Sequence, residues 1–453
     1  MNSVLSRSVL ILHDRITGRH ILNRLEDLNR TQWLSRDELL ALQRANLKRL
    51  LEYAYQYVPY YQRVFKEIGF QPGDLDQDLT LFGKLPILTK AIIRENYQDM
   101  QTTEEGRRRG MSELCTSGST GEPLVFMQDA DFRDAVTADV QRHMGWAGWE
   151  IGDLQALIWC AAANPTLKWK TRTQLIDWVW NRFRLNAYAM TDATMTGFAE
   201  RIRHDKPKIL FGFATDLYHF AQFVRDSPYQ GINFNGIFST AELLHPTMRQ
   251  FVEETFNCQI FNRYGSFELG GVACECAAHT GHHISVENNY VEILHEGFPV
   301  EVGYVGDLIV TNLNNFGMPF IRYSIGDAGA WYGDEACPCG RASPMLQAIE
   351  GRIRDAFHTR DGRTFYSGFS GHAFHCLAHP TIKQFQIIQK NLDKIIVRLM
   401  PDGEVPQTAL DEISQAIRGL FGDNVLVTFE FLEKIPSLPS GKHQYAISEI
   451  NRG

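Results

Sequence analysis

The chain has 453 residues, which at about 150 residues per domain corresponds to roughly three structural units. Hydrophobic residues make up 44% and charged residues 22%, which is typical of globular proteins and excludes collagenous, coiled-coil and disordered chains. The net charge of −8 argues against a protein that binds nucleic acid through bulk charge. We interpret the compact basic run Arg107–Arg109 as part of a solvated loop.

The N-terminal region carries no sign of a secretory or membrane segment. The apolar run Val9–Leu12 is followed at once by polar and charged residues, and it is too short for a signal-peptide core or a bilayer span. No run of about 18 apolar residues occurs elsewhere. We therefore expect a soluble, cytoplasmic protein without membrane insertion, in which paired cysteines are metal ligands or thiols rather than disulfides.

Residues 1–70 are expected to be helical. Ser35 and Glu38 have the spacing of a capping box at a helix start. Pro59 is expected to end this helix, because the residue before a proline disfavours helical backbone. The apolar positions that recur at helical intervals behind the cap are Leu40, Leu47, Leu50, Leu51, Ala54 and Val58.

From about residue 110 to residue 350, short apolar strands alternate with helical stretches. This alternation predicts an α/β sheet built from βαβ units. The strand candidates are Leu154–Cys160, Ile209–Phe213, Ile237–Ser239, Gln259–Phe261 and Leu308–Asn312.

The last hundred or so residues have a different pattern. Phe385–Ile388 and Ile395–Leu399 are strand candidates separated by a polar turn, and Val425–Phe431 is a third. Between them, one face of a helix is marked by Leu410, Ile413, Ile417 and Leu420. This ββαβ order predicts a small α+β domain. We therefore divide the chain into a large N-terminal α/β body, residues 1–350, and a small C-terminal domain, residues 351–453.

The stretch Thr116–Pro123 has four hydroxyl residues and two glycines within six positions. Glycines let the backbone turn sharply, and successive N–H groups with hydroxyls form a cradle for phosphate oxygens. A polar surface loop explains the same composition. Gly121 is followed by Glu122 rather than by Lys, so the stretch is not a Walker A loop, and a P-loop kinase or GTPase is disfavoured.

Four of the eight cysteines form two Cys-x-Cys pairs, Cys274/Cys276 and Cys337/Cys339, and His279, His282 and His283 follow the first pair. Soft sulfur and imidazole ligands without an evident open position favour a structural zinc site. Free thiols that bind no metal are the alternative.

Five short motifs in a fixed order resemble those of the adenylate-forming superfamily, which includes acyl-CoA ligases and adenylation domains. They are Thr116–Pro123, Tyr264–Glu268, Arg322–Asp327, Gly351–Asp355 and Pro439–Lys442. Within that superfamily the chain is similar to the phenylacetate–CoA ligase and CapK-like branch. The segments that carry this closer resemblance are Val58–Tyr61, the Thr116–Pro123 loop, Cys337–Arg341 and Phe385–Gln389.

The resemblance implies the adenylate-forming fold: a large two-lobed α/β body with βαβ sheets and a small, mobile α+β cap that moves about a hinge at Arg354. It also implies a reaction in which a carboxylic acid, aromatic or small, attacks ATP to give an acyl-adenylate and pyrophosphate. A thiol such as CoA then takes the acyl group. A carrier protein, an amine or a saccharide is an alternative acceptor, and a zinc-stabilised nucleotide-binding protein without turnover is the non-enzymatic alternative.

The resemblance also implies the roles of individual residues. The catalytic residues are Lys442, which bridges the carboxylate and the α-phosphate, Glu268, which binds Mg²⁺, and Thr116. Tyr264 stacks on adenine, whereas Asp327 and Arg352 contact the ribose. The remaining ATP-binding residues that it implies are Ser117, Gly118, Ser119, Thr120, Gly121, Ala241, Glu242, Asn262 and Gly265.

For the metal, the resemblance implies the zinc ligands Cys276, His283, Cys337 and Cys339, with Cys274 as the alternative to His283. Two positions depart from the superfamily pattern, because Phe267 and Ile325 stand where a threonine is usual. Both departures remove a polar contact. Trp146, Trp149, Trp159, Phe211 and Phe213 form either an aromatic floor for the acyl group or ordinary core.

Overall fold

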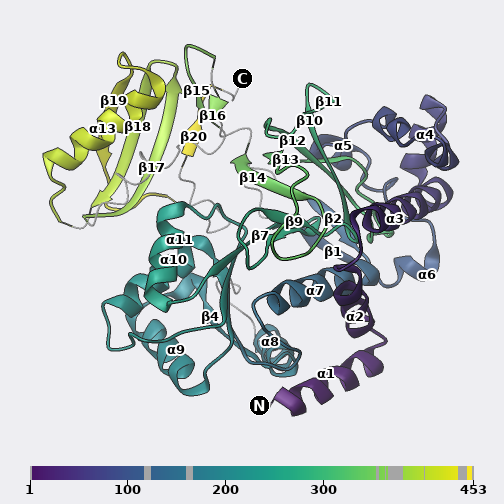
Figure 1. Cartoon of the computed structure of the whole chain (residues 1–453), viewed down its shortest axis with the longest axis horizontal. Helices are drawn as coiled ribbons and strands as arrows, with labels where there is room; N and C mark the ends of the chain where they lie inside the picture. Colours follow the sequence, from purple (N-terminus) through teal and green to yellow (C-terminus); the bar gives the residue numbers. More distant parts are fainter. Residues whose placement is uncertain are drawn as a thin grey trace.

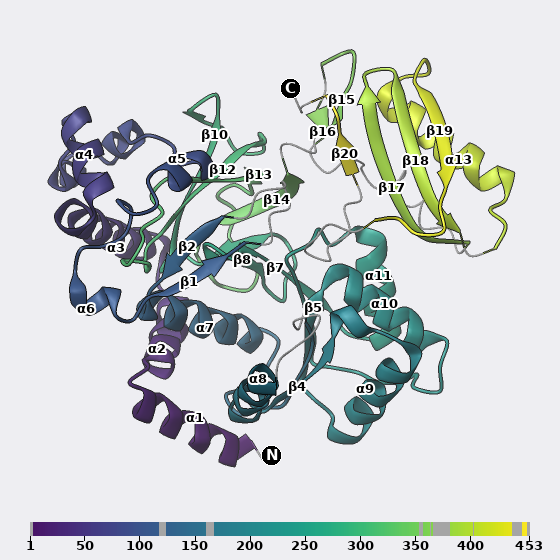
Figure 2. The same cartoon turned by 180° about the vertical axis from the view of Figure 1, so that it is seen from behind.

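The computed structural model describes residues 3–116, 124–159, 167–352, 357–362, 364–365, 381–401, 403–436 and 446–450. Figures 1 and 2 show a large body that contains most of the helices and a small sheet domain at one end, formed by the C-terminal part of the chain. Among the described residues, no helix combines the length and the apolar character that crossing a bilayer requires.

The chain begins with helices that pack along one side of the body (Figure 1). They are α1 (Ser3–Thr17), α2 (Ile21–Thr31), α3 (Arg36–Tyr57) and α4 (Pro59–Ile68), followed by the 3-10 turns η1 (Pro72–Asp76) and η2 (Leu79–Lys84) and the short helices α5 (Lys90–Glu95) and α6 (Glu105–Arg108). The predicted capping box at α3 is confirmed: Ser35 Oγ accepts from the Glu38 N–H at 3.4 Å, and the Glu38 carboxylate accepts from the Ser35 N–H at 2.9 Å. As predicted, α3 ends before Pro59, which starts the next helix.

A twelve-stranded sheet forms the centre of the body. Its strand order is β11-β10-β12-β13-β14-β9-β8-β7-β6-β5-β3-β4. One half is parallel and consists of β3 (Gln155–Trp159), β4 (Arg182–Asn186), β5 (Ile209–Phe213), β6 (Gly236–Thr240) and β7 (Ile260–Ser266). Its helical elements are α7 (Ala130–Gly145), α8 (Leu167–Val179), the 3-10 turn η3 (Ala187–Ala189), α9 (Asp192–Asp205), α10 (Ala214–Arg225) and α11 (Pro246–Phe256).

The other half of the sheet is antiparallel. Its strands are β8 (Gly270–Glu275), β9 (His282–Ile284), β10 (Asn289–His295), β11 (Phe298–Pro299), β12 (Gly306–Asn312), β13 (Tyr323–Trp331) and β14 (Met345–Arg352). The expected alternation of strands and helices therefore holds only up to β7. Beyond it, within the described residues 257–352, the strands follow one another without a helix. Short connections join antiparallel neighbours, whereas parallel neighbours need a crossover.

A separate two-stranded hairpin lies beside the large sheet. It pairs β1 (Ser112–Cys115) with β2 (Val125–Gln128), and its connection contains the hydroxyl- and glycine-rich stretch. Residues 117–123 of that stretch lie outside the described part of the chain. The hairpin leads directly into α7, so its return strand is held against the body.

The C-terminal domain confirms the predicted ββαβ order. Its elements are β15 (Phe357–His358), β16 (Thr364–Phe365), β17 (Ile382–Asn391), β18 (Lys394–Pro401), α13 (Gln407–Phe421), β19 (Leu426–Phe431) and β20 (Ala446–Ser448). The last short strand pairs parallel to β17, which gives a four-stranded sheet in the order β19-β18-β17-β20. Ile413 and Ile417 of α13 are fully buried, as their helical spacing predicts. The fold class predicted from the sequence, an α/β body with a smaller α+β domain, is therefore confirmed.

Candidate functional site

Two residues with predicted nucleotide contacts meet in the folded chain. The Tyr264 hydroxyl of β7 donates to Asp327 Oδ2 of β13 at 2.9 Å. Arg352, the last residue of β14, lies opposite Asp327 in the strand pairing, although its side chain lies outside the described part of the structure. The fold thus brings together three residues that come from distant parts of the sequence.

Glu268 lies in the tight connection between β7 and β8. Its side chain is buried, and the Tyr323 hydroxyl donates to Glu268 Oε1 at 3.3 Å. The strand residues that flank this connection include a required glycine, because a Cβ atom on Gly265 would lie 2.1 Å from the Gly270 carbonyl oxygen. Gly270 itself has a φ of 71°, which side chains disfavour. These glycines fix where the carboxylate stands.

Thr116 marks the base of the predicted phosphate loop. Its N–H donates to the Leu124 carbonyl at 2.9 Å, and its hydroxyl accepts from the Leu124 N–H at 2.9 Å. The hydroxyl therefore closes the loop and keeps its own proton to donate. Ser117, Gly118, Ser119, Thr120 and Gly121 lie outside the described residues.

The return strand of the loop hairpin is tied to the turn that carries Glu268. The Gln128 amide donates to the Phe267 carbonyl at 2.9 Å, and the Phe267 ring meets the Phe126 ring edge to face, with centroids 5.8 Å apart. Phe267 is one of the two departures from the superfamily pattern. It lacks the hydroxyl of the usual threonine, but its ring packs the turn that carries Glu268, the predicted magnesium ligand, against the hairpin. Sequence reasoning missed this contact, since only the fold brings residues 126 and 267 together.

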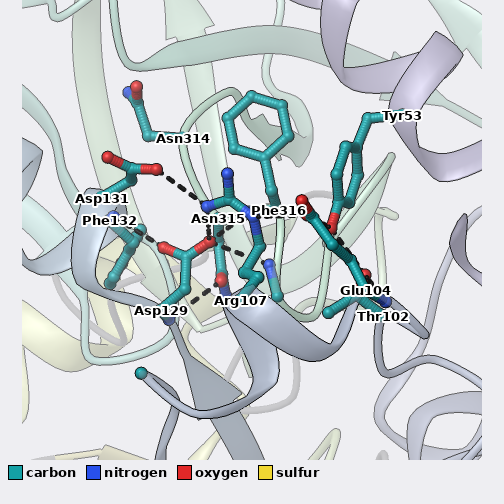
Figure 3. A network of polar contacts seen from close by, with 12 residues as sticks. Tyr53, Thr102, Glu104, Arg107, Asp129, Asp131, Phe132, Asn314, Asn315 and Phe316 are labelled. Carbon is teal, nitrogen blue, oxygen red and sulfur yellow. Dashed lines mark hydrogen bonds and ion pairs between the residues drawn. The ribbon is translucent and has the colours of Figure 1, made fainter.

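A network of polar contacts fixes the junction of the hairpin and α7 (Figure 3). Asp129 Oδ1 accepts from the Phe132 N–H at 2.8 Å, and Asp129 Oδ2 accepts from the Gly317 N–H at 2.9 Å. The Arg107 guanidinium donates to both Asp129 and Asp131 at 2.8 Å. The interpretation of Arg107–Arg109 as a solvated loop is therefore wrong for Arg107, which is half-buried between two carboxylates.

The electrostatics of this network follow from its burial. Desolvation alone would raise the pKa of Asp131, but the Arg107 and Arg24 guanidiniums hold it below its usual value. Desolvation would lower the pKa of Arg107, and the two aspartates raise it instead. The junction of β2 and α7, at the end of the hairpin opposite the predicted phosphate loop, therefore rests on an ion pair that stays charged at neutral pH.

Ala241 and Glu242 directly follow the carboxyl end of β6, where ligands bind in open parallel sheets. Asn262 of β7 pairs with Ser239 near the same end of β6. Ala241 has a φ of 64°, so the chain turns sharply after β6. Glu242 Oε2 accepts from the Thr215 N–H at 3.0 Å and from its hydroxyl at 2.7 Å, which satisfies the first turn of α10. The carboxylate therefore holds the start of α10 beside the predicted adenine pocket.

The aromatic residues proposed as a pocket floor separate into two groups. Trp159 and Phe213 stand half-buried at the carboxyl ends of β3 and β5, with ring centroids 4.7 Å apart. Trp149 is buried in the apolar core, and Trp146 packs beside His283 with centroids 6.0 Å apart. Trp159 and Phe213 fit the floor interpretation, whereas Trp149 is core.

The four residues named as zinc ligands converge. One ligand atom from each of Cys276, His283, Cys337 and Cys339 lies within 4.8 Å of all the others. Cys276 Sγ is 3.5 Å from Cys337 Sγ, and Cys339 Sγ is 3.3 Å from His283 Nε2. A tetrahedral zinc with bonds of about 2.3 Å to sulfur and 2.0–2.1 Å to nitrogen separates its ligand atoms by roughly 3.6–3.8 Å. The donor set and its spacing fit this ion.

Surrounding groups orient these ligands. His283 Nδ1 lies 3.0 Å from Ser343 Oγ, which leaves Nε2 to face the three sulfur atoms. The Ala278 and Arg341 N–H groups each donate to a cysteine sulfur at 3.4 Å. Burial raises the pKa of the Cys276 thiol to about 12 and lowers that of His283 to about 4. The imidazole is therefore neutral, and a bound cation would be needed to hold the buried sulfur as thiolate.

Cys274, the alternative to His283, lies elsewhere. Its side chain is fully buried in an apolar cluster with Phe238 and Phe261. It pairs across the strands with His283 through the backbone, but its sulfur is not among the four clustered ligand atoms. Lys442 and the hinge candidate Arg354 lie outside the described residues.

Comparisons with known proteins show what this chain is similar to. Residues 357–449 match the CapK C-terminal domain family. Protein CapK from Staphylococcus aureus is 23% identical over 91% of this chain and 90% of its own length. Phenylacetate-coenzyme A ligase from Escherichia coli is 28% identical over 73% of this chain and 75% of its own length.

A solved structure shares the fold along most of the chain. 2-Hydroxyisobutyryl-CoA ligase in its postadenylation state has a TM-score of 0.72 at 21% identity, with 90% of both chains covered. This chain is therefore similar to CapK and to phenylacetate-coenzyme A ligases, which confirms the predicted resemblance to the phenylacetate–CoA ligase and CapK-like branch.

Proposed function

We propose that this protein activates a carboxylic acid with ATP and passes the acyl group to a thiol such as that of CoA. A carboxylate oxygen bonds to the α-phosphorus while the bond from that phosphorus to the β-phosphate oxygen breaks, so pyrophosphate leaves. The thiol sulfur then bonds to the acyl carbon and AMP leaves. The hydrogen bond between Tyr264 and Asp327 carries the proposal, because two residues with implied adenine and ribose contacts meet there.

The residues around that pair have complementary tasks. Asp327 accepts from the ribose hydroxyls, Arg352 adds a contact to the same sugar, and Tyr264, next to Gly265 in β7, stacks on adenine. Ala241, Glu242 and Asn262 line the adenine side, where the Glu242 carboxylate already fixes the start of α10. The small domain, residues 351–453, closes over this face. The chain thus positions the nucleotide before any bond changes.

A second group of residues would bind the phosphates and stabilise their negative charge. Thr116 and the residues Ser117 to Gly121 hold the β- and γ-phosphates, and Lys442 stabilises the charge that builds on the α-phosphoryl group. The Glu268 carboxylate fits a hard cation, and Mg²⁺ when bound there neutralises phosphate oxygens. Because the chain is acidic overall, positive charge must be supplied locally at this site.

For the acyl group we propose an aromatic or small carboxylic acid. The half-buried rings of Trp159 and Phe213 at the carboxyl ends of neighbouring strands support this assignment, as these ends face the predicted site. Zinc held by Cys276, His283, Cys337 and Cys339 is proposed as a structural ion, since all four ligand positions are filled by the protein. We place the protein in the cytoplasm.

A different acceptor is the second candidate. The C-terminal residues 357–449 match CapK rather than a domain named for a CoA ligase, and the match to CapK spans 91% of the chain. Because the name of this family states no acceptor, we keep a carrier-protein thiol, an amine or a saccharide as the alternative group that takes the acyl chain. Both candidates share the adenylation step.

A pyrophosphate-release screen over aromatic and small carboxylic acids tests the proposal. The protein is assayed with ATP and Mg²⁺, with and without CoA, and thioester is measured in parallel. We expect release that depends on the acid in both conditions, with faster turnover when CoA is the acceptor. Release without any thioester favours the second candidate. No release with any acid leaves only nucleotide binding without turnover and contradicts the proposal.

A further inference from the structure

Helix α1 turns an apolar face away from the rest of the protein. The side chains that form this face are Val4, Leu5, Ile11, Leu12 and Ile16, of which Ile16 is 74% and Leu12 is 58% exposed. Its inward face carries Ser6, Leu10 and Asp14 instead, and the Asp14 carboxylate accepts from the Leu22 N–H at 3.0 Å. Surface helices normally bury their apolar stripe, so the outward stripe is not needed to hold this helix in place.

Helix α8, which contacts α1, also exposes apolar side chains. Leu175, Ile176 and Trp178 are exposed on it, with Leu175 at 60% and Trp178 at 55%. The two helices are in contact and lie side by side in both views (Figures 1 and 2). We call the exposed side chains of both helices the α1–α8 patch. Contiguous exposed apolar surface of this kind marks an interaction site, whereas single exposed residues do not.

The exposed charges that the two helices themselves carry have one sign. Arg7 and Arg15 of α1 and Arg172 of α8 are exposed. The acidic residues of these helices are Asp14 and Asp177, and both are buried. The described, exposed formal charges of α1 and α8 are therefore all positive, on a chain whose net charge is −8.

The positive charge of the two helices distinguishes two possible binding partners of the patch, a second copy of the chain and an anionic lipid layer. In a two-fold dimer the same patch meets itself, so the arginines of one copy would face those of the other. An anionic lipid headgroup layer instead attracts the arginines, while Leu, Ile and Trp side chains enter the boundary with the acyl chains. We propose that the α1–α8 patch docks this protein on an anionic lipid bilayer, with the two helices lying in the plane of the surface rather than crossing it.

Vesicle flotation tests this proposal on the full-length protein. Vesicles of phosphatidylcholine alone are compared with vesicles containing about 30% phosphatidylglycerol, at low and high salt. We expect binding to the anionic vesicles that weakens at high salt, because surface charges are then screened. The double variant Leu12→Glu, Ile16→Glu should lower binding at least about tenfold, since it places carboxylates in the apolar stripe. Both positions are exposed, so its thermal unfolding should match that of the wild type.

Matched variants make the outcomes decisive. Phe298→Glu with Val302→Glu changes two exposed apolar residues elsewhere and should leave vesicle binding unchanged. Arg7→Gln with Arg15→Gln and Arg172→Gln should remove the preference for anionic over neutral vesicles. A wild type that floats with neither vesicle overturns the proposal, as does a Leu12/Ile16 variant that binds like the wild type. A wild-type dimer that this variant converts to a monomer without vesicles assigns the patch to a second copy instead.

Discussion

The cysteine–histidine cluster and the proposed nucleotide-binding face are built differently, although both gather residues from distant strands. The cluster is complete within the described structure, with four ligand atoms within 4.8 Å of one another and donors around them. The nucleotide-binding face is assembled only in part, because Tyr264 and Asp327 meet while the loop residues and Lys442 are outside that structure.

We attribute this difference to the proposed functions of the two sites, which are structural for the cluster and catalytic for the nucleotide-binding face. A structural ion gains nothing from movement, so its ligands stand on strand ends and tight turns that lock them in place. The proposed nucleotide-binding face would admit ATP, release pyrophosphate and meet an acceptor, and in this proposal it draws residues from a loop and from a second domain. Variants in the cluster should therefore affect stability, and variants on the nucleotide-binding face should affect turnover.

The largest effect is expected from Lys442→Ala. Loss of the ammonium removes charge stabilisation that matters only in the transition state, so acid-dependent pyrophosphate release should fall by at least about 10³-fold while ATP binding changes little. Lys434→Ala, an exposed lysine of the same domain, serves as the control and should keep wild-type activity. A Lys442 variant that retains most of its release would rule out this role.

Cys276→Ser should act on stability instead. Losing one of four ligands lowers zinc occupancy, and the apparent melting temperature should fall by at least about 5 °C. Cys274→Ser is the matched control, because it changes a buried cysteine of the neighbouring strand without touching the cluster. Elemental analysis and thermal unfolding are measured on both. Equal zinc content in the two variants, or less than about 0.2 zinc per wild-type chain, would contradict the assignment.

A smaller effect is expected at the pair on the nucleotide-binding face. Asp327→Asn weakens the acceptor for the ribose hydroxyls and should raise the KM for ATP about tenfold, since hydrogen bonds to charged groups contribute roughly 1.5–3 kcal/mol. Tyr264→Phe keeps the ring and removes the hydroxyl that donates to Asp327, so its KM should rise less. Steady-state kinetics at saturating acid measure both. An Asp327 variant with an unchanged KM would separate this carboxylate from the nucleotide.

The smallest expected effect is on the pH dependence of the free energy of unfolding. Burial and the neighbouring Glu242 carboxylate raise the pKa of Asp216 from its usual 3.8 to about 7. Between these two values the folded chain holds a proton that the unfolded chain has lost, so this group makes stability fall as pH rises through that window. Asp216→Asn removes the titration.

Melting temperatures at pH 5 and pH 8 measure this effect. Relative to wild type, the Asp216→Asn variant should gain stability on going from the lower to the higher pH. Asp226→Asn, at the exposed other end of α10, should show no such gain. A constant difference between the Asp216 variant and wild type would mean that the carboxyl is ionised in the fold at both pH values.

The predictable part of the fold was the part with local periodicity. The capping box at Ser35 and the ββαβ order of the small domain both follow from spacing along the chain. The antiparallel half of the large sheet could not be predicted in this way, because apolar runs look alike in parallel and antiparallel strands. Only the short connections between strands after β7 distinguish the two arrangements.

The candidate site divides in the same way. The zinc ligand set and the residues at positions 264, 268 and 327 came from motifs, and the fold brings the first set together and pairs Tyr264 with Asp327. The contacts that support them were not predictable, since they join residues far apart in sequence. Examples are the Gln128 amide on the Phe267 carbonyl and Gln32, whose side chain accepts from Trp146 and Arg341 beside the cluster.

The central claim is that a carboxylate oxygen attacks the α-phosphorus of ATP. The most direct measurement uses an acid that supports pyrophosphate release, labelled with ¹⁸O in its carboxylate, followed by mass spectrometry of the nucleotide after a full turnover with the acceptor. The account predicts AMP that carries one ¹⁸O atom, since the oxygen that bonded to phosphorus stays with it. Label in inorganic phosphate together with ADP, or unlabelled AMP, would contradict it.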